Sequence, residues 1–269
     1  MSTSSTPPDE GKARDAANTA DDGKLQDNEL KPRDAAYWAQ QAATLKVSHV
    51  PTGALNLNVE GKRVVGPLQG FGQMWRKTYR VFLHGASVQP MEVIKTWKER
   101  FRSFWPKGNR FYAPLTGIAP GEVALINASL GAGMELSTGV LVLYADEESF
   151  TLMTPQGHVF AGWITFSAYE EDDCIIAQVQ LLIRANDPLY EAGLRLFAHK
   201  AEDRLWQRTL EALATHFEVA EAKVETNVVC LDPRLQWSQA GNIWHNAGIR
   251  TMMYKMSAPL RWIRGRTRS

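Results

Sequence analysis

The sequence contains only two cysteines, Cys174 and Cys230. Neither belongs to a CxxC pair or another metal-spaced cluster, which argues against a disulfide framework or a cysteine-based zinc site. Both are predicted to be reduced, small buried residues of a cytoplasmic protein. No apolar run approaches the roughly 20 residues of a membrane-spanning helix, and the N-terminal MSTSSTPPDEGKARD lacks the apolar core of a secretory signal.

Charge of one sign is also lacking, because the formal net charge is only +1. A nucleic-acid partner is therefore not predicted. No GxSxG, HExxH or phosphate-binding loop occurs, and the GFG at residues 70–72 opens no dinucleotide fingerprint. The acidic runs 146–148 and 170–173 lack the spaced, glycine-turned form of a calcium loop, so they are interpreted as solvated turns. The sequence thus predicts neither a metal nor a cofactor.

Four regions can be distinguished along the chain. Residues 1–35 are polar and predict a disordered tail. Residues 36–76 predict an N-terminal extension, with a short helix after Asp34 and a hairpin that turns at Glu60-Gly61. Residues 77–219 carry the main domain, and residues 220–269 form a C-terminal extension with a basic, amphipathic tail.

The main domain begins with the alternating strand KTYRVFL, residues 77–83. A helix is predicted from Pro90, with Trp97, Phe101 and Phe104 on its apolar face, and it ends at Pro106. Short turns then separate strands that are predicted to pair antiparallel. They cover Arg110–Ala113, Glu122–Ala128, Leu136–Ala145, Ser149–Met153, Gly157–Ser167 and Cys174–Arg184. Gly162, in the middle of a strand, indicates a bulge or the close approach of another backbone or a ligand.

A long helix is predicted from about Asp187 to Phe217. Asp187-Pro188 supplies an N-cap and a first-turn proline. Apolar positions recur in steps of three and four along one face, which includes Leu196 and Trp206 but also His199 and Asp203.

The order strand, helix, antiparallel strands and closing helix resembles the START-like helix-grip superfamily, also called SRPBCC. The residues that carry the resemblance are YRVFLHGASVQPMEVIKTW, the block GHVFAGWITFSAYEEDDCIIAQVQLLIRANDPLYE, and the closing helix. The block is similar to an uncharacterised bacterial branch, in which a GH-x-F-x-G strand precedes an aspartate-proline helix start. The resemblance implies an α+β fold, with a curved antiparallel sheet wrapped around a long C-terminal helix and a cavity between them. It implies no catalytic motif.

His199 and Asp203 are the first candidate pair, because they lie one helical turn apart on the face that would line the cavity. They could pair with each other, bind a ligand, or act as a general base. The alternative is a structural polar contact. His158, at the start of its strand, is a third candidate, with an ordinary surface histidine as its alternative.

Aromatic side chains could line an apolar pocket, although core packing is the favoured explanation for most of them. The predicted ligand-binding residues are Trp97, Phe101, Phe150, Phe160, Phe166, Leu196, His199, Asp203 and Trp206.

The C-terminal tail combines basic and apolar residues and contains no acid after Arg250. Such a pattern fits an interfacial membrane helix or a partner contact, and self-packing is the alternative. The predicted contact residues are Arg250, Lys255, Arg261, Trp262, Arg264 and Arg266.

Three functions remain open at this stage. The favoured hypothesis is a non-enzymatic protein that binds or carries a hydrophobic small molecule or lipid, with peripheral membrane contact as an option. The second is a cyclase- or hydratase-like enzyme that uses His199 and Asp203. The third is a structural or interaction protein that docks onto partners through its tail.

Overall fold

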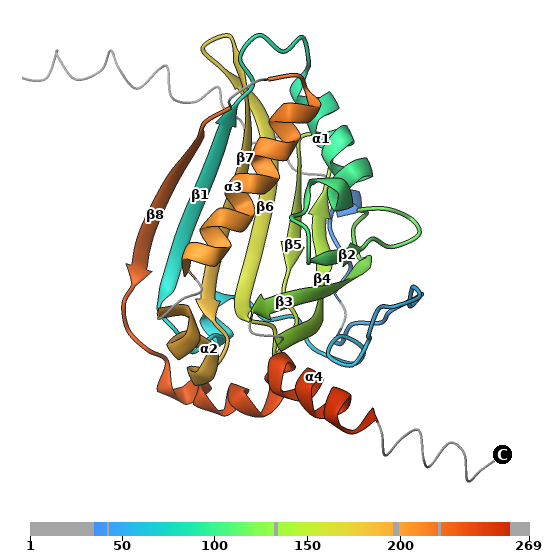
Figure 1. Ribbon diagram of the computed structural model, residues 1–269, viewed down its shortest axis with the longest axis vertical. Helices are drawn as coiled ribbons and strands as arrows, with labels where there is room; N and C mark the ends of the chain where they lie inside the picture. Colours follow the sequence, from blue (N-terminus) through green and yellow to red (C-terminus); the bar gives the residue numbers. More distant parts are fainter. Residues whose placement is uncertain (1–34, 42, 132–133, 196–198, 220–221, 259–269) are drawn as a thin grey trace, which may run out of the picture. The chain divides into compact units, whose positions relative to one another are not determined.

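The computed structural model describes residues 35–258, except for residues 42, 132–133, 196–198 and 220–221 (Figure 1). The chain divides into two units after Ala35. Apart from Ala35, the predicted disordered tail of residues 1–35 lies outside the described residues. The strands are β1 (Met74–Phe82), β2 (Arg110–Tyr112), β3 (Val123–Gly131), β4 (Met134–Ala145), β5 (Ser149–Met153), β6 (Phe160–Glu171), β7 (Cys174–Ala185) and β8 (Val224–Asp232). The α-helices are α1 (Pro90–Arg100), α2 (Pro188–Gly193), α3 (His199–His216) and α4 (Ala247–Met256). The 3-10 helices are η1 (Ala35–Tyr37), η2 (Pro67–Gln69), η3 (Phe101–Phe104) and η5 (Trp237–His245).

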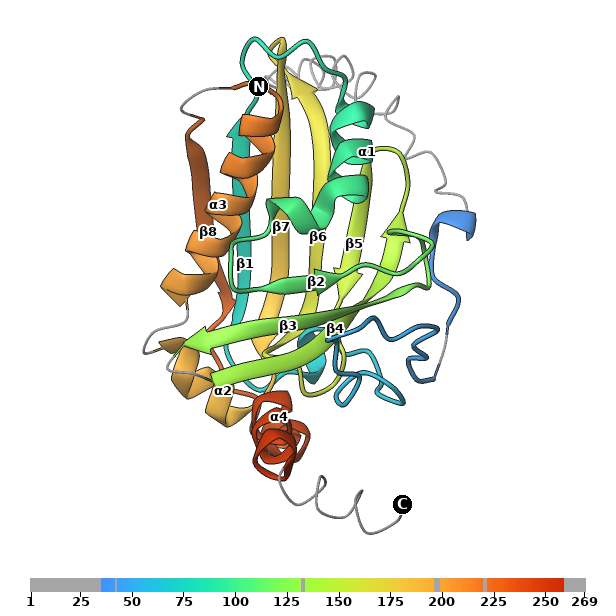
Figure 2. The same cartoon turned by 45° about the vertical axis from the view of Figure 1, so that its right-hand side comes forward.

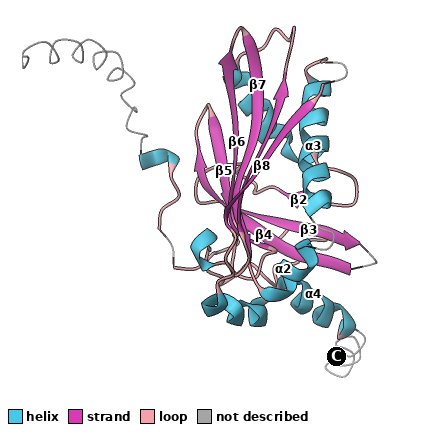
Figure 3. Cartoon of the chain, turned by 90° about the vertical axis from the view of Figure 1, so that its left-hand side faces the viewer, coloured by secondary structure: helices cyan, strands magenta, loops and turns pink. Residues whose placement is uncertain are grey.

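The eight strands form one antiparallel sheet in the order β2-β3-β4-β5-β6-β7-β1-β8. The sheet is bent, because β3 and β4 turn away from the direction of β5, β6 and β7 (Figure 3). α1 and α3 lie on the same face of the sheet (Figure 2). This is the helix-grip arrangement that the sequence predicts, and the α+β fold class is confirmed.

The main core lies between this concave face and the two helices. Alternate residues of each strand point into it, among them Tyr79 and Val81 of β1 and Val179 and Leu181 of β7. Burying the side chains of one strand face against helices is the dominant stabilising contribution in such a fold, at about 25 cal/mol for each Å² of apolar surface.

The opposite face of β3 and β4 is covered by the N-terminal extension. Leu45 and Val59 of the extension are buried against Tyr112 and Leu125. The predicted hairpin at residues 53–65 is wrong, because this segment forms turns and pairs only through an isolated bridge between Val64 and Pro155. The predicted short helix is reduced to η1. The extension is held by side-chain burial and by backbone hydrogen bonds such as those of Val65 with Thr154 and Gly162, which a local strand pattern does not reveal.

The predicted helix over residues 187–217 is helical in all its described residues from 188 to 195 and again in α3, and residues 196–198 lie outside the described part of the chain. Asp187 does cap α2, since its carboxylate accepts hydrogen bonds from the backbone N–H groups of Leu189 and Tyr190. However, α2 ends at Gly193, and Leu189, which the periodicity places on the buried face, is exposed. α3 extends from His199 and buries Trp206 as predicted.

The sheet continues beyond the predicted domain end at residue 219. β8 pairs antiparallel with β1 along most of its length and forms one edge of the sheet. Cys230 lies on this strand and, like Cys174, is partly exposed rather than buried. Both cysteines are free thiols, as predicted.

Candidate functional site

A group of charged side chains is buried between β1 and α3. The Lys77 ammonium lies 2.7 Å from Glu202 Oε2 and 2.9 Å from Asp203 Oδ1. The Tyr79 hydroxyl donates a hydrogen bond of 2.6 Å to the same Asp203 oxygen. The Lys77 side chain is only 1% exposed. We call Lys77, Tyr79, Glu202 and Asp203 the ionic cluster.

The alternation of β1 and the turn of α3 bring this cluster together. Lys77 and Tyr79 share the inward face of β1 with Val81, so a lysine side chain is directed into the core. On α3, Glu202 and Trp206 are one turn apart and both face the sheet. A lysine on an inward strand position therefore requires acids from the covering helix, because an unpaired buried ammonium is very costly.

The pKa values follow from burial and from the opposite charges. Burial disfavours the charged form of Lys77, but the Glu202 and Asp203 carboxylates outweigh it and raise the pKa of Lys77, which stays protonated. Burial raises the pKa of Glu202, and the attraction of Lys77 only partly opposes this. Burial and the nearby carboxylates raise the pKa of Tyr79, which keeps its proton. One ammonium thus faces two carboxyl groups.

Two polar atoms beside the cluster have no hydrogen-bond partner within the described part of the chain. They are Glu202 Oε1 and Trp206 Nε1, and both are buried. The indole N–H of Trp206 lies close enough to the Glu202 carboxyl to lower its pKa, but the two groups do not meet the combined distance and angle limits of a hydrogen bond. A hydroxyl group placed between them would satisfy both atoms, whereas a protonated amine would donate to Glu202 and leave the Trp206 N–H without an acceptor.

Apolar side chains continue from the cluster along the concave face. Trp75 lies two residues before Lys77 on the same face, and it pairs across to Ile183 of β7. Ile183 in turn pairs with Gly162, which Phe160 and Ile164 flank on β6. We call Trp75, Phe160 and Ile164 the lower concave surface. These three are packed against the core but remain partly exposed.

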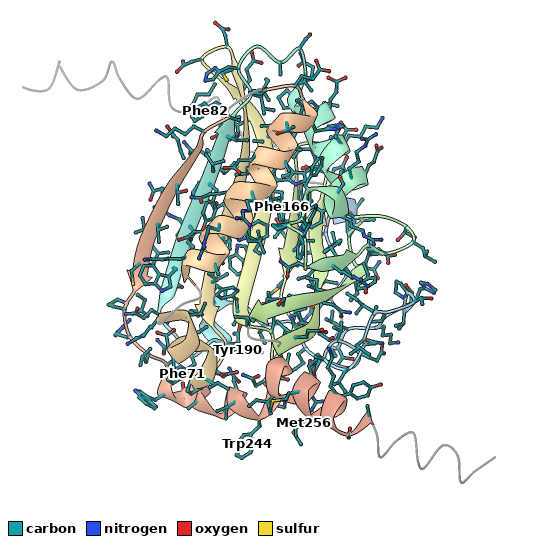
Figure 4. All side chains as sticks on the ribbon, in the orientation of Figure 1. Phe71, Phe82, Phe166, Tyr190, Trp244 and Met256 are labelled. Atoms are coloured by element: carbon teal, nitrogen blue, oxygen red, sulfur yellow. The ribbon has the colours of Figure 1, made fainter. Side chains whose placement is uncertain are left out.

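The predicted pocket aromatics divide into two groups. Five of them pack on one another beneath α1 and α3: Trp97, Phe101, Phe150, Phe166 and Trp206. Ring centroids are 4.6 Å apart for Phe150 and Phe166 and 5.7 Å apart for Phe166 and Trp206 (Figure 4 labels Phe166). Their contacts favour the core-packing alternative. Phe160 lies apart from them and contacts the small cluster around Tyr190.

Other predicted site residues do not meet at the ionic cluster. The side chain of His199 and the whole of Leu196 lie outside the described residues. Asp203 is the exception, because its carboxylate belongs to the ionic cluster and accepts hydrogen bonds from Lys77 and Tyr79 of β1. His158 precedes β6, and its Nδ1 accepts a hydrogen bond from the backbone N–H of Phe160. Of the predicted tail contacts, Arg261, Trp262, Arg264 and Arg266 lie outside the described residues.

His158 should make the folding stability depend on pH. Burial lowers its pKa to about 4, against 6.5 for a free histidine. The unfolded chain therefore binds more protons than the folded one between these values, and stability falls as pH is lowered through this range. We expect His158→Asn, which retains an acceptor, to remove about 2 kcal/mol of the stability lost between pH 7 and pH 5. Urea titrations at both pH values test this, and equal losses in the two proteins would contradict it.

Lys77, Tyr79 and Glu202 are the members of the cluster that the sequence prediction missed. The available signal was the phase of β1, in which Lys77 shares a face with Tyr79, Val81 and Leu83. A charged residue on the apolar phase of a strand indicates a buried charge that requires a partner.

An open groove lies elsewhere on the protein. It encloses about 610 Å³ and is lined by Leu68, Met74, Arg184, Leu231, Asp232, Pro233, Arg234 and Gln236. Met74 and Arg184 alternate with Trp75 and Ile183, so this groove opens on the opposite face of the sheet. Arg184 is committed there to the Asp232 carboxylate and to the carbonyl oxygens of Gly72 and Arg234. These hydrogen bonds indicate that Arg184 has a structural role in this groove and holds β7 to the segments around Gly72 and Asp232.

The described part of the chain has neither a metal-binding cluster nor a membrane-spanning helix. It contains no group of three or more His, Cys, Asp and Glu side chains that could hold a metal ion. None of its helices combines the length and the apolar character needed to cross a bilayer.

Comparison with known proteins finds likeness only among solved structures. No family model and no curated protein sequence matches the chain. The crystal structure of Ara h 8.0201 aligns with 54% of this chain and 98% of its own at 13% identity and a TM-score of 0.40. The di-domain ARO/CYC StfQ from the steffimycin biosynthetic pathway aligns with 54% of this chain and 51% of its own, at 8% identity and 0.43. The crystal structure of TTHA0849 from Thermus thermophilus aligns with 55% of this chain and 99% of its own, at 14% identity and a TM-score of 0.39. Likeness at this level carries no inference about ligand or activity.

Proposed function

We propose that this protein binds an apolar small molecule or lipid that carries a hydroxyl or amine group. The apolar part lies on the lower concave surface, and the polar group reaches Glu202 and Trp206 at the ionic cluster. The observation that carries the proposal is the unpartnered Glu202 oxygen and Trp206 N–H beside partly exposed apolar side chains.

The energetics of the cluster support a role in binding. A buried ion pair contributes little to stability on balance, because desolvation offsets its Coulomb attraction. Here two carboxyl groups share one ammonium, so the site holds an excess of hydrogen-bond acceptors and of negative charge. A ligand that donates a hydrogen bond offsets that excess, whereas a carboxylate ligand increases it.

Binding is favoured over catalysis by the state of the cluster. The pKa of Lys77 is raised by its acidic neighbours, so the amine is protonated and is a poor base or nucleophile. The enzyme hypothesis requires an imidazole beside Asp203, and the partners of Asp203 among the described side chains are Lys77 and Tyr79. The use of His199 in catalysis stays a prediction, as do the cytoplasmic location and the kinship with a bacterial branch.

Three probes of equal chain length test the polar preference: dodecanol, dodecylamine and dodecanoate. Each is titrated into the full chain while the melting temperature is recorded, since a ligand that binds the folded state raises it. We expect the alcohol and the amine to bind about tenfold more tightly than the carboxylate, a difference of about 1.4 kcal/mol. Equal stabilisation by the three probes would contradict the proposal that the ionic cluster binds the polar group of the ligand.

A pair of matched variants tests the position of the apolar part. Phe160→Ser removes a partly exposed ring from the lower concave surface, and we expect it to weaken dodecanol binding about tenfold. Phe82→Ser is the control, because Phe82 is also partly exposed but lies on the outer phase of β1, where its ring stacks on His84. The same affinity in both variants would contradict the proposed position.

A further inference from the structure

Helix α4 has its apolar side chains on the outside. The residues that it buries against β4 are small or polar, Ala247 and Thr251. Met252, Met253 and Met256 lie on the other side and are exposed, Met256 by 73%. A surface helix of a globular protein normally shows the reverse pattern.

Hydrogen bonds fix this orientation. Asn58 is buried beneath α4 and donates to the Ala247 carbonyl and to Thr251 Oγ1. Arg250 donates to Asn58 Oδ1, which completes the contact from the helix side. The start of α4 is held as well, because the Asn246 amide donates to the Asp187 carboxylate. The exposed methionines are therefore held in place and do not result from a loosely attached helix.

The preceding segment presents two tryptophans in the same way. Trp244 is 83% exposed, and Trp237 is largely exposed despite an edge contact with Phe71. Trp244 points away from the sheet (Figure 4). Asn242 anchors this segment through hydrogen bonds to the carbonyl oxygens of Gln69 and Asn186. We call Trp237, Trp244, Met252, Met253 and Met256 the η5–α4 surface.

Positive charge accompanies this surface. Burial lowers the pKa of His245, and the neighbouring charges of Lys62, Arg250 and Arg63 lower it further. Residues 233–269 contain seven Lys or Arg and no Asp or Glu. Within α4, Lys255 is paired with Glu135, so Lys62, Arg63 and Arg250 supply most of the local charge.

We propose that the η5–α4 surface docks on an anionic lipid bilayer. Tryptophan is suited to the interface between headgroups and acyl chains, the methionines enter the apolar layer, and the cations meet acidic headgroups. A second copy of the chain is disfavoured, because a two-fold contact would bring together two surfaces that both carry the positive charges of Lys62, Arg63 and Arg250. This inference deepens the peripheral membrane contact predicted from the tail, and it does not depend on ligand binding at the ionic cluster.

Flotation with lipid vesicles tests the proposal on the full chain. Vesicles of phosphatidylcholine are compared with vesicles in which about one third of the lipid is phosphatidylserine, at low and high salt. We expect binding to the anionic vesicles alone, and its loss at high salt. Trp244→Ala and Met252→Ser are each expected to reduce the partition coefficient about tenfold. Replacing Lys62 and Arg63 by glutamine is expected to reduce it to a similar extent.

The control is Met91→Ser on α1, because Met91 and Met252 are equally exposed, at 51%. Met91→Ser is expected to bind as the wild type does. Failure of the wild type to float with anionic vesicles, or equal losses in the two methionine variants, would overturn the proposal. A concentration-dependent dimer that Trp244→Ala abolishes would overturn it too, since the surface would then hold a second copy. If Trp244→Ala loses vesicle binding but still binds dodecanol, the membrane surface and the proposed ligand site are independent, and each proposal can fail without the other.

Discussion

Replacing Lys77 by methionine is expected to lower the free energy of unfolding by about 3 kcal/mol. The change keeps much of the side-chain volume but leaves Glu202 and Asp203 facing each other without the ammonium. Glu202 is buried, so its carboxyl then becomes charged only at high cost. The deficit should therefore be smaller at pH 5 than at pH 8, because protonated Glu202 leaves less uncompensated charge. Urea titrations at the two pH values measure both effects.

Two comparisons separate the lost ion pair from other consequences of the substitution. Arg76→Met alters the next residue of β1, which is exposed on the outer face, and should change stability by less than about 0.5 kcal/mol. The double variant Lys77→Met with Glu202→Gln should be more stable than Lys77→Met alone, because it removes one of the stranded charges. Equal losses in the Lys77 and Arg76 variants would show that the cluster is not a buried, coupled unit.

Replacing Gly162 by alanine should destabilise the protein by more than about 3 kcal/mol. Gly162 has φ +150°, and a Cβ atom there would lie 2.1 Å from the Leu182 carbonyl oxygen of the paired strand. The same residue accepts a hydrogen bond from the backbone N–H of Thr154 and donates one to the Val65 carbonyl, so the strand cannot shift without losing the extension. The substitution therefore disturbs β6 next to the lower concave surface, and thermal unfolding measures the loss.

Gly85→Ala is the matched control. Gly85 also has a positive φ, +74°, but a Cβ atom there would meet nothing within 4 Å. Its cost should be limited to backbone strain of about 1–2 kcal/mol. Similar losses at the two glycines would mean that β6 adjusts to a side chain at residue 162.

The sequence predicted most of the sheet because local signals at those positions agree. β5 has the predicted bounds, and β7 differs from its prediction by one residue. The α1 and α2 starts were predictable from Pro90 and from Asp187-Pro188, where the proline and the cap act within one turn. Gly162 was correctly associated with close backbone approach, and that backbone belongs to Leu182 of the paired strand β7.

Elements that depend on distant partners were not predictable in the same way. β8 is an edge strand whose residues are mostly exposed, so it lacks an alternating apolar pattern, and its register comes from β1 about 150 residues earlier. The orientation of α2 has a similar origin. The apolar periodicity predicted Leu189 on the buried face, but Tyr190 of α2 and its C-cap residue Leu194 are buried against Ala185 instead.

The candidate site shows the same limit. Asp203 was singled out because it interrupts an apolar helix face, and its carboxylate does contact the sheet. Its partner Lys77 is 126 residues away, and the apolar phase of β1 indicates that Lys77 requires a partner but not which residue supplies it. Only the packing of α3 against β1 brings Glu202 and Asp203 to the lysine.

Mass spectrometry of freshly purified full-length protein tests the central claim most directly, with one spectrum recorded under native conditions and one after denaturation. We expect the native mass to exceed the chain mass by that of a small apolar molecule with a hydroxyl or amine group, and the excess to vanish on denaturation. Phe160→Ser should carry less of it, and Phe82→Ser should carry the wild-type amount. A native mass equal to that of the bare chain, together with no stabilisation by dodecanol or dodecylamine, would contradict the account.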